Sequence, residues 1–179
     1  MESGSVAAAG YSFRSMTAED LYMVHRWLET PEVRRWWGDP DREISLLEAD
    51  LHDPRMAMWI VSHQGRPFAY IQDYAPGDWL MHHFGFLPPG SRGIDQLIGE
   101  PDMIGCGHGS AFVRAHVDRL FAAGVLAVGV DPDPENARAI RAYEKAGFVP
   151  GQVQNTEWGP ALLMTRFAER KLRAHSLPG

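Results

Sequence analysis

The pattern of apolar and polar positions divides the chain into short apolar runs and segments with helical spacing. Short runs rich in β-branched and aromatic residues predict strands. They cover residues 11–16, 56–63, 68–75, 92–99, 125–131 and 160–167. The runs at 56–63 and 68–75 flank the turn Gln-Gly-Arg-Pro, which predicts a hairpin. The segment 76–91 is rich in glycine and proline and is predicted to be irregular.

Segments with apolar residues three and four positions apart predict helices between these strands. One begins after Thr17, which forms a capping-box pattern with Asp20, and ends at Pro31. Further helices are predicted at 43–51, 110–123 and 134–146, the last two closed by Gly124 and Gly147. The segment 32–41 is predicted to be a short turn-rich element.

This order of elements predicts an α/β fold in which helices cover both faces of a mixed central sheet. The chain has 179 residues and a mass of 20.0 kDa, which fits a single domain with its own core. We expect the domain to span residues 11–168, with residues 1–10 and 169–179 as flexible ends.

Composition narrows the class of partner. A formal net charge of −6 argues against nucleic acid. The chain has no apolar run of the roughly 20 residues needed to cross a bilayer, and its first residues lack a signal-peptide pattern. The single cysteine, Cys106, excludes an intrachain disulfide and fits a reducing compartment. We therefore expect a cytoplasmic protein without a membrane partner, either a monomer or a homodimer, and no metal site.

Three alternating glycines, Gly105, Gly107 and Gly109, stand where a helix must begin. A glycine destabilises a helix by about 1 kcal/mol relative to alanine, so their presence needs a reason. The free N–H groups and positive dipole of a helix start bind anions, and pyrophosphate is the usual one. A P-loop would need Lys-Ser/Thr where Ser110-Ala111 stand, and a dinucleotide fingerprint would need glycine at 110. A phosphate loop of another kind and a bare glycine-rich turn both remain open.

Two segments resemble the hallmarks of a known superfamily, the GCN5-related N-acetyltransferases (GNAT). Residues 104–121 look like its coenzyme A pyrophosphate loop and helix, and residues 130–148 like its N-x-x-A-x-x-x-Y-x-x-x-G-F motif. Residues 27–40 and 92–99 are further similar to aminoglycoside 6′-N-acetyltransferases. The resemblance implies the GNAT fold, acetyl-CoA as cofactor, and acetyl transfer to a primary amine of a small cationic molecule, with the aminoglycoside 6′-amine as the named candidate.

The resemblance also implies which residues hold the cofactor. They come from a strand that diverges from its neighbour, from the glycine loop and from the helix after the next strand: Gln96, Leu97, Ile98, Gly105, Cys106, Gly107, His108, Gly109, Ser110, Asn136, Ala139 and Tyr143. A cap of the helix is the alternative role of Asn136. The superfamily loop usually carries a basic residue where Cys106 stands, so one cationic contact is missing.

Catalytic roles are implied for three residues. Tyr143 is the candidate general acid for the leaving thiolate, or else a packed aromatic residue. Asp95 lies in a strand that is otherwise apolar, where it either binds and deprotonates the amine or forms an internal salt bridge with Arg92 or another arginine. Asp131, at the end of the next strand, either helps to hold the amine or shapes the following turn.

The acceptor side is less defined by the sequence. Trp36, Trp37 and Trp79 are candidates to line an acceptor pocket together with the two aspartates, with packing in the core as the alternative. His82 and His83 point to opposite faces if the segment is extended, and we read them as solvated rather than catalytic. The aminoglycoside enzymes tend to carry an acidic run before Arg-Gly-Ile-Asp-Gln, and this chain does not.

Two other functions stay open. Residues 97–109 also resemble hydroxylysine acetyltransferases, so an acyltransferase of lysine or hydroxylysine derivatives in siderophore-type metabolism is an alternative. A non-catalytic acyl-CoA-binding protein on the same fold is another.

Overall fold

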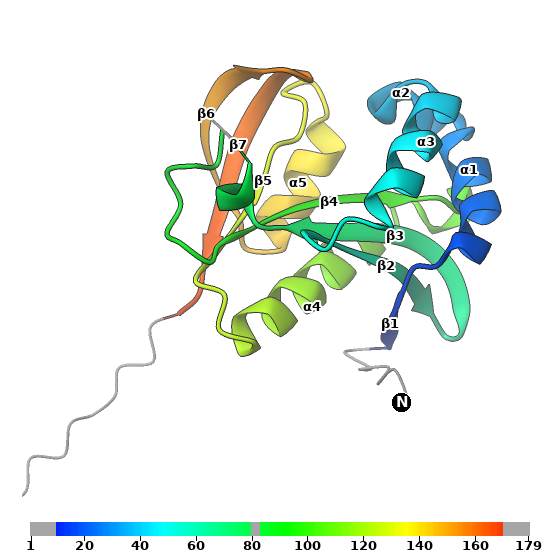
Figure 1. Ribbon diagram of the computed structural model, residues 1–179, viewed down its shortest axis with the longest axis horizontal. Coiled ribbons are helices and arrows are strands. Elements are labelled where there is room, and N and C mark those ends of the chain that lie inside the picture. The colour runs from blue at the N-terminus through cyan, green and yellow to red at the C-terminus, as the bar shows by residue number, and fades with distance from the viewer. Residues whose placement is uncertain (1–9, 80–82, 170–179) are drawn as a thin grey trace, which may run out of the picture.

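The computed structural model describes residues 10–79 and 83–169 and consists of one mixed sheet with helices on both faces (Figure 1). The seven strands have the order β1-β2-β3-β4-β5-β7-β6. They are β1 (Tyr11–Ser15), β2 (Met56–His63), β3 (Arg66–Tyr74), β4 (Arg92–Ile98), β5 (Ala127–Val130), β6 (Val149–Thr156) and β7 (Gly159–Phe167). The helices are α1 (Leu21–Leu28), α2 (Pro31–Trp37), α3 (Pro40–Asp50), α4 (His108–Ala122) and α5 (Ala137–Lys145). The predicted α/β architecture is confirmed.

Side chains alternate between the two faces of the sheet and so build two cores. On β2, Val61 joins the core beneath α4 and α5, while its neighbour Ile60 joins the core beneath α1, α2 and α3. Figure 1 shows the three N-terminal helices over one face and α4 against the other. A smaller cluster packs Phe84 and Leu87 of the loop before β4 against β5 and β7.

One prediction about local structure is wrong, and one strand was not predicted. The segment 32–41 is not turn-rich: Pro31 starts α2 instead of only ending α1, because proline suits the first position of a helix. Residues 149–156 form the edge strand β6, which the pattern does not predict. This strand contains Pro150 and Gly151, and most of it is exposed, so it has no apolar alternation, and only its pairing with β7 defines it.

Two helices begin at earlier residues than predicted, and both differences matter for the site. α3 begins at Pro40 because the Asp39 side chain accepts a hydrogen bond from the Arg42 N–H at 2.9 Å. α4 begins at His108, two residues before the predicted start, so Gly109 lies inside its first turn. The predicted capping box of Thr17 and Asp20 is present. Within the described segments, no helix is long and apolar enough to cross a membrane.

The central parallel pair, β4 and β5, stays together over only two residue pairs. Arg92 pairs with Val128 and Gly93 with Gly129, and after that the strands diverge. Both glycines allow a close approach, since a Cβ on Gly93 would collide with the ring of Tyr74 and one on Gly129 with the ring of Phe84. The sheet therefore opens as a V between β4 and β5, and the glycines at its apex let the rings of Tyr74 and Phe84 pack against the backbone.

Candidate active site

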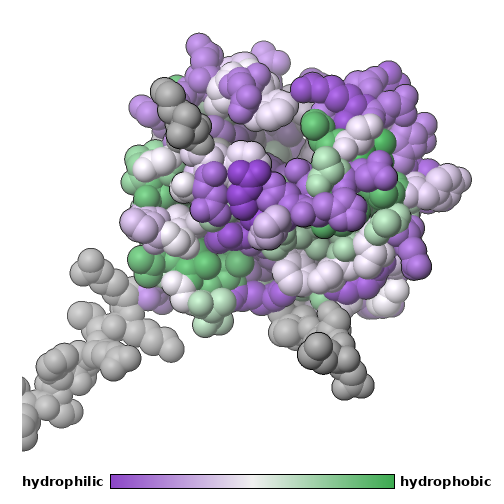
Figure 2. Space-filling view, viewed as in Figure 1, coloured by the Kyte–Doolittle hydropathy of each residue, from purple (hydrophilic) through white to green (hydrophobic). Residues whose placement is uncertain are grey.

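A cavity of about 1090 Å³ fills the opening of this V and continues between the α2–α3 region and the β6–β7 hairpin. Figure 2 shows the surface hollowed between these two parts of the molecule. One end, here called the cofactor end, is lined by β4, the glycine loop and α5. The other, here called the acceptor end, is lined by α2, α3 and the turn that joins β6 to β7. Except for Cys106 and His108, the residues that the sequence predicts for the cofactor and the acceptor line this one cavity.

The glycine loop opens directly into the cavity. Gly105 and Gly107 have φ angles of 77° and 87°, a left-handed conformation that is strained for any residue with a side chain. Nothing lies within 4 Å of where a Cβ would be at either position. Gly107 is the N-terminal cap of α4, so the free N–H groups of its first turn start at this loop. Gly109 and Ser110 line the cavity just behind. The loop is therefore shaped for an anion that contacts backbone.

The two other predicted loop residues direct their side chains elsewhere. The exposed thiol of Cys106 lies 3.6 Å from the carbonyl oxygens of Asp102 and Ile104. His108 places Nδ1 at 2.7 Å from the hydroxyl of Tyr11 and packs its ring against His63, and burial, followed by the charge of His63, lowers its pKa. Neither side chain lines the cavity, so any contact of these residues with a phosphate comes from backbone.

The remaining predicted cofactor residues all line the same end. They are Gln96, Leu97 and Ile98 on β4, and Asn136, Ala139 and Tyr143 at α5. Asn136 accepts a hydrogen bond from the Ala139 N–H at 3.1 Å, so its alternative role as the helix cap is present in the structure. Its contact with a cofactor stays a prediction.

Tyr143 is buried, and its hydroxyl is at the cavity wall. Gln96 Nε2 donates a hydrogen bond to this hydroxyl at 3.4 Å, and the ring packs edge-on against Phe148. Burial raises the pKa of Tyr143, so the phenol keeps its proton at neutral pH. The group is thus a protonated, poorly solvated O–H facing the cavity.

Asp95 lies on β4 one residue before Gln96 and also faces the cavity. Gln72 Nε2 donates to its Oδ2 at 2.9 Å. Burial, followed by the negative charge of Asp131, raises the pKa of Asp95 to about 7. The alternative salt bridge to Arg92 is wrong: residues three apart in a strand point to opposite faces, and Arg92 pairs with Asp73 at 2.6 Å instead.

Asp131 lies beyond the end of β5, and its Oδ2 is 2.8 Å from Nε2 of His83. The side chain of His83 is only 11 % exposed, so its prediction as a solvated histidine is wrong. His82 lies outside the described residues. The structure therefore brings an imidazole next to the two carboxylates of the site, which the sequence did not predict.

All three predicted tryptophans line the cavity, and Trp36 and Trp37 belong to α2 at the acceptor end. Trp37 packs edge-on against Tyr70, and the guanidinium of Arg55 lies 4.0 Å from the ring centre of Trp79. A fourth tryptophan, Trp158 on the β6–β7 turn, also lines the cavity and is 66 % exposed. No local pattern pointed to it, because the edge strand before it was not predicted.

Acidic side chains also line the acceptor end, although the loop before β4 has no acidic run. Glu32, Glu43, Asp50 and Glu157 belong to α2, α3 and the β6–β7 turn, and Asp131 and Asp133 line the cavity after β5. Two cations, Arg35 of α2 and Arg42 of α3, line it as well. Burial raises the pKa values of Glu43 and Asp50, and the nearby charges of Asp39 and Asp53 raise them further. These carboxylates favour a cation beside them. Within the described ranges, no three His, Cys, Asp or Glu side chains are grouped as a metal ion would need.

The fold, the glycine loop and the opened strand pair define an acetyltransferase of the GNAT class. Residues 16–156 match the family model described as acetyltransferase (GNAT) domain, and the chain belongs to this family.

Among named relatives, the chain is 34% identical over 178 residues to the aminoglycoside N(6′)-acetyltransferase type 1 of Klebsiella pneumoniae, with 93% of this chain and 87% of the relative covered. It is 24% identical to the spermidine N(1)-acetyltransferase of Escherichia coli strain K12, with 97% and 94% covered. A solved structure of AAC(6′)-Ib in complex with ribostamycin and coenzyme A has a TM-score of 0.81 and 32% identity, with 93% of this chain and 99% of that chain covered.

Proposed function

We propose that this protein transfers the acetyl group of acetyl-CoA to the 6′-amine of an aminoglycoside. The observation that carries the proposal is the placement of Asp95 and Tyr143 in one cavity, between a loop shaped for phosphate and an acidic acceptor end. The relatives named for 6′-acetylation of aminoglycosides, and the structure with ribostamycin and coenzyme A, support it.

The cofactor end fits coenzyme A. Gly105 and Gly107 leave open space at the start of α4 for a pyrophosphate, and the divergence of β4 from β5 leaves room for an extended arm beside Gln96, Leu97 and Ile98. When bound, acetyl-CoA supplies an acetyl group activated as a thioester. Such a cosubstrate is made in the cytoplasm, where we propose that the enzyme acts.

The side chains at the centre of the cavity divide the proton transfers between them. The substrate arrives as an ammonium ion, and Asp95, with a pKa of about 7, accepts its proton directly or through one water. The amine nitrogen then forms the bond to the acetyl carbon while the carbon–sulfur bond breaks. Tyr143, which keeps its proton, donates it to the departing thiolate. Backbone N–H groups of β4 that face the gap polarise the acetyl carbonyl oxygen.

The acceptor end fits a substrate with several ammonium groups. Carboxylates of α3, Glu43 and Asp50, line the same cavity as Asp95 of β4 and Asp131 after β5, so a molecule there meets negative charge from several elements. In relatives with an acidic loop before the cofactor strand, that loop would supply part of this charge. Here, helix α3 supplies it instead.

Release of free thiol from acetyl-CoA tests the proposal. The amine panel is kanamycin, tobramycin, lysine, N-hydroxylysine, spermidine and a peptide N-terminus. We expect release with kanamycin and tobramycin, and mass spectrometry of the product with a single acetyl group at the 6′-amine. Release with the lysine derivatives alone would contradict the aminoglycoside assignment, and release with no amine despite tight coenzyme A binding would favour the non-catalytic alternative.

A further inference from the structure

Three cationic side chains of α5 line the cofactor end of the cavity. They are Arg138, Arg141 and Lys145. Their spacing of three and four residues places them along one face of the helix. Their side chains are exposed, and none of the three forms an ion pair with a carboxylate in the described parts of the chain. This basic face is therefore available to an anion.

The basic face lies directly beside the glycine loop. A Cβ placed on Gly109 in the first turn of α4 would lie 3.9 Å from the Cβ of Ala142, which fixes where α5 passes the loop. Arg114 of α4 also donates to the main-chain carbonyl of Lys145. Arg138 precedes Ala142 by one helical turn and Lys145 follows it by nearly one, so cations lie on either side of the contact.

The loop itself offers no cation toward the cavity. From Ile104 to Ser110 the only side chain that can carry a positive charge is that of His108, and it turns to Tyr11 and His63. The acceptor end of the same cavity is lined by carboxylates. In the described segments, the other arginines that line the cavity, Arg35 and Arg42, belong to α2 and α3. A phosphorylated ligand at the loop therefore meets positive side-chain charge on the side that faces α5.

We infer that Arg138, Arg141 and Lys145 bind the phosphate groups of coenzyme A and replace the basic residue that the loop lacks. The inference rests on the proposed use of acetyl-CoA and adds which side chains recognise its charge. The opposite charges of the two ends also orient the ligands, with the phosphates at α5 and the amine at α3.

Calorimetric titration of three ligands tests this in the intact protein. The ligands are coenzyme A, 3′-dephospho-coenzyme A and pantetheine, which carries no phosphate. The test variant combines Arg138→Gln with Arg141→Gln. Its control combines Arg26→Gln with Arg34→Gln, which removes the same charge from exposed positions on α1 and α2 outside the cavity. Lys145→Gln is a second, independent test variant.

We expect the Kd for coenzyme A to rise at least about tenfold in the test variant, as for the loss of charge-assisted hydrogen bonds, and the Kd for pantetheine to stay unchanged. The control should bind both ligands like the wild type. A loss that disappears with 3′-dephospho-coenzyme A would place the contact at the 3′-phosphate, and a loss that persists would place it at the pyrophosphate; both support the inference.

An unchanged Kd for coenzyme A, or an equal loss for pantetheine, would overturn it. The result is independent of turnover. If the α5 variants weaken coenzyme A binding but the wild type acetylates no amine, only the proposed function is refuted. If the wild type is active but the α5 variants bind coenzyme A as tightly as it does, only this inference is refuted.

Discussion

The carboxylate of Asp73 holds the guanidinium of Arg92 where β4 and β5 begin to diverge. Arg92 Nε donates to Asp73 Oδ1 at 2.8 Å, and its Nη2 donates to the Asp73 carbonyl at 2.9 Å. The other carboxylate oxygen, Oδ2, lies 3.0 Å from Trp59 Nε1 and from His116 Nε2. Because Arg92 pairs with Val128 across the apex, this network joins β2, β3, β4 and α4 just where the cavity opens.

Replacement of Asp73 should destabilise the fold strongly. Burial alone would raise the pKa of Asp73, but the hydrogen bond and charge of His116, followed by Arg92, outweigh it and lower the pKa. We expect Asp73→Ala to cost about 3–5 kcal/mol in the free energy of unfolding, because it leaves the buried partners uncompensated. Urea denaturation above pH 6 measures this.

Asp53→Ala is the matched control, since Asp53 pairs with Arg55 at the surface and its loss should leave stability nearly unchanged. Because the pKa of Asp73 is lowered in the fold, its contribution is also expected to vanish as the pH falls below the ordinary value of about 3.9. Equal effects of the two variants would contradict the role of the buried network.

Asp95→Asn should lower kcat/KM about 10²-fold or more, as for the loss of a general base. Since the pKa of Asp95 is raised to about 7, wild-type activity should increase as the pH rises through that value. The variant should not show this increase. A pH profile of kcat/KM from pH 5.5 to 9 measures it. If kcat/KM of the variant still rises near pH 7, a group other than Asp95 causes the pH dependence.

The same substitution should stabilise the protein at high pH. A raised folded-state pKa means that the native state binds an extra proton, so stability falls as the pH rises from about 4 to about 7. The introduced asparagine would keep a hydrogen bond with Gln72 without this cost. The Tm gain of Asp95→Asn should therefore be larger at pH 8 than at pH 5, and the reverse order would contradict the assigned environment.

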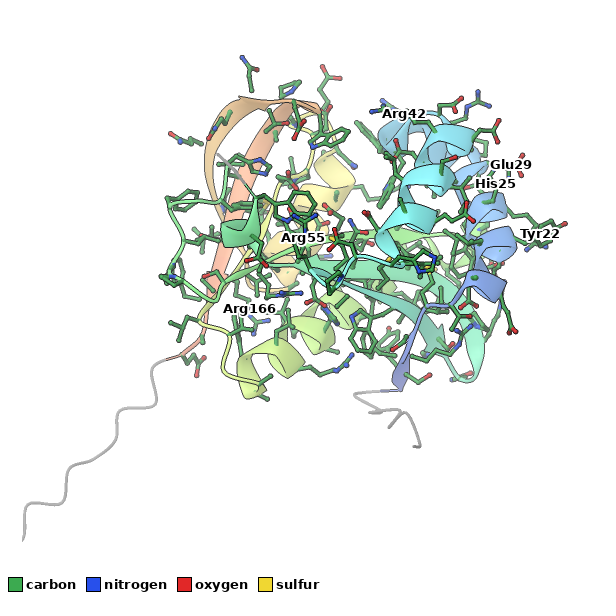
Figure 3. All side chains as sticks on the ribbon, in the orientation of Figure 1. Tyr22, His25, Glu29, Arg42, Arg55 and Arg166 are labelled. Atoms are coloured by element: carbon green, nitrogen blue, oxygen red, sulfur yellow. The ribbon has the colours of Figure 1, made fainter. Side chains whose placement is uncertain are left out.

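Tyr143→Phe should lower kcat about 10²-fold, because it removes the proton donor of the thiolate. The ring and its packing against Phe148 remain, so the Tm and the KM for acetyl-CoA should stay close to wild type. Tyr22→Phe is the control: Tyr22 lies on α1, 76 % exposed, and points away from the cavity (Figure 3). Full activity of Tyr143→Phe would reduce Tyr143 to a packing residue.

Gly107→Val should raise the KM for acetyl-CoA steeply, by at least about tenfold, because a side chain would fill the open space in which the phosphates are proposed to bind. Valine at a φ of 87° is also strained. Gly90→Val carries the same strain, since Gly90 has a φ of 81° and open space around it, but it lies outside the cavity. A similar rise in KM for both variants would trace the effect to strain.

Asp50→Asn should raise the KM for kanamycin several-fold and leave the KM for acetyl-CoA unchanged. Its carboxylate lines the acceptor end, and burial keeps its pKa raised despite the positive charge of Arg55. Glu48→Gln removes the same charge from the exposed side of α3, outside the cavity, and should change neither KM. Equal effects of the two would indicate general electrostatics instead of a contact.

The sequence by itself determined the fold class and two local patterns at the cofactor end. The requirement for glycine at Gly105 and Gly107 is local: a left-handed backbone at the start of a helix excludes side chains wherever it occurs. The spacing from Asn136 to Tyr143 is likewise set by one helix, whose period fixes which side chains share a face. Such features can be read from neighbouring residues.

Only the tertiary structure decided the acceptor end. The carboxylates of α3, the pair of Asp131 with His83, and Trp158 meet in one cavity although the chain separates them widely, and no local period brings them together. Likewise, Arg92 pairs with Asp73 and not with Asp95 because of the face of the sheet that each side chain occupies once β3 and β4 are paired. A loop can be specified by the conformations its own residues allow, whereas a substrate pocket is specified by the packing of distant elements, and that information is spread over the whole chain.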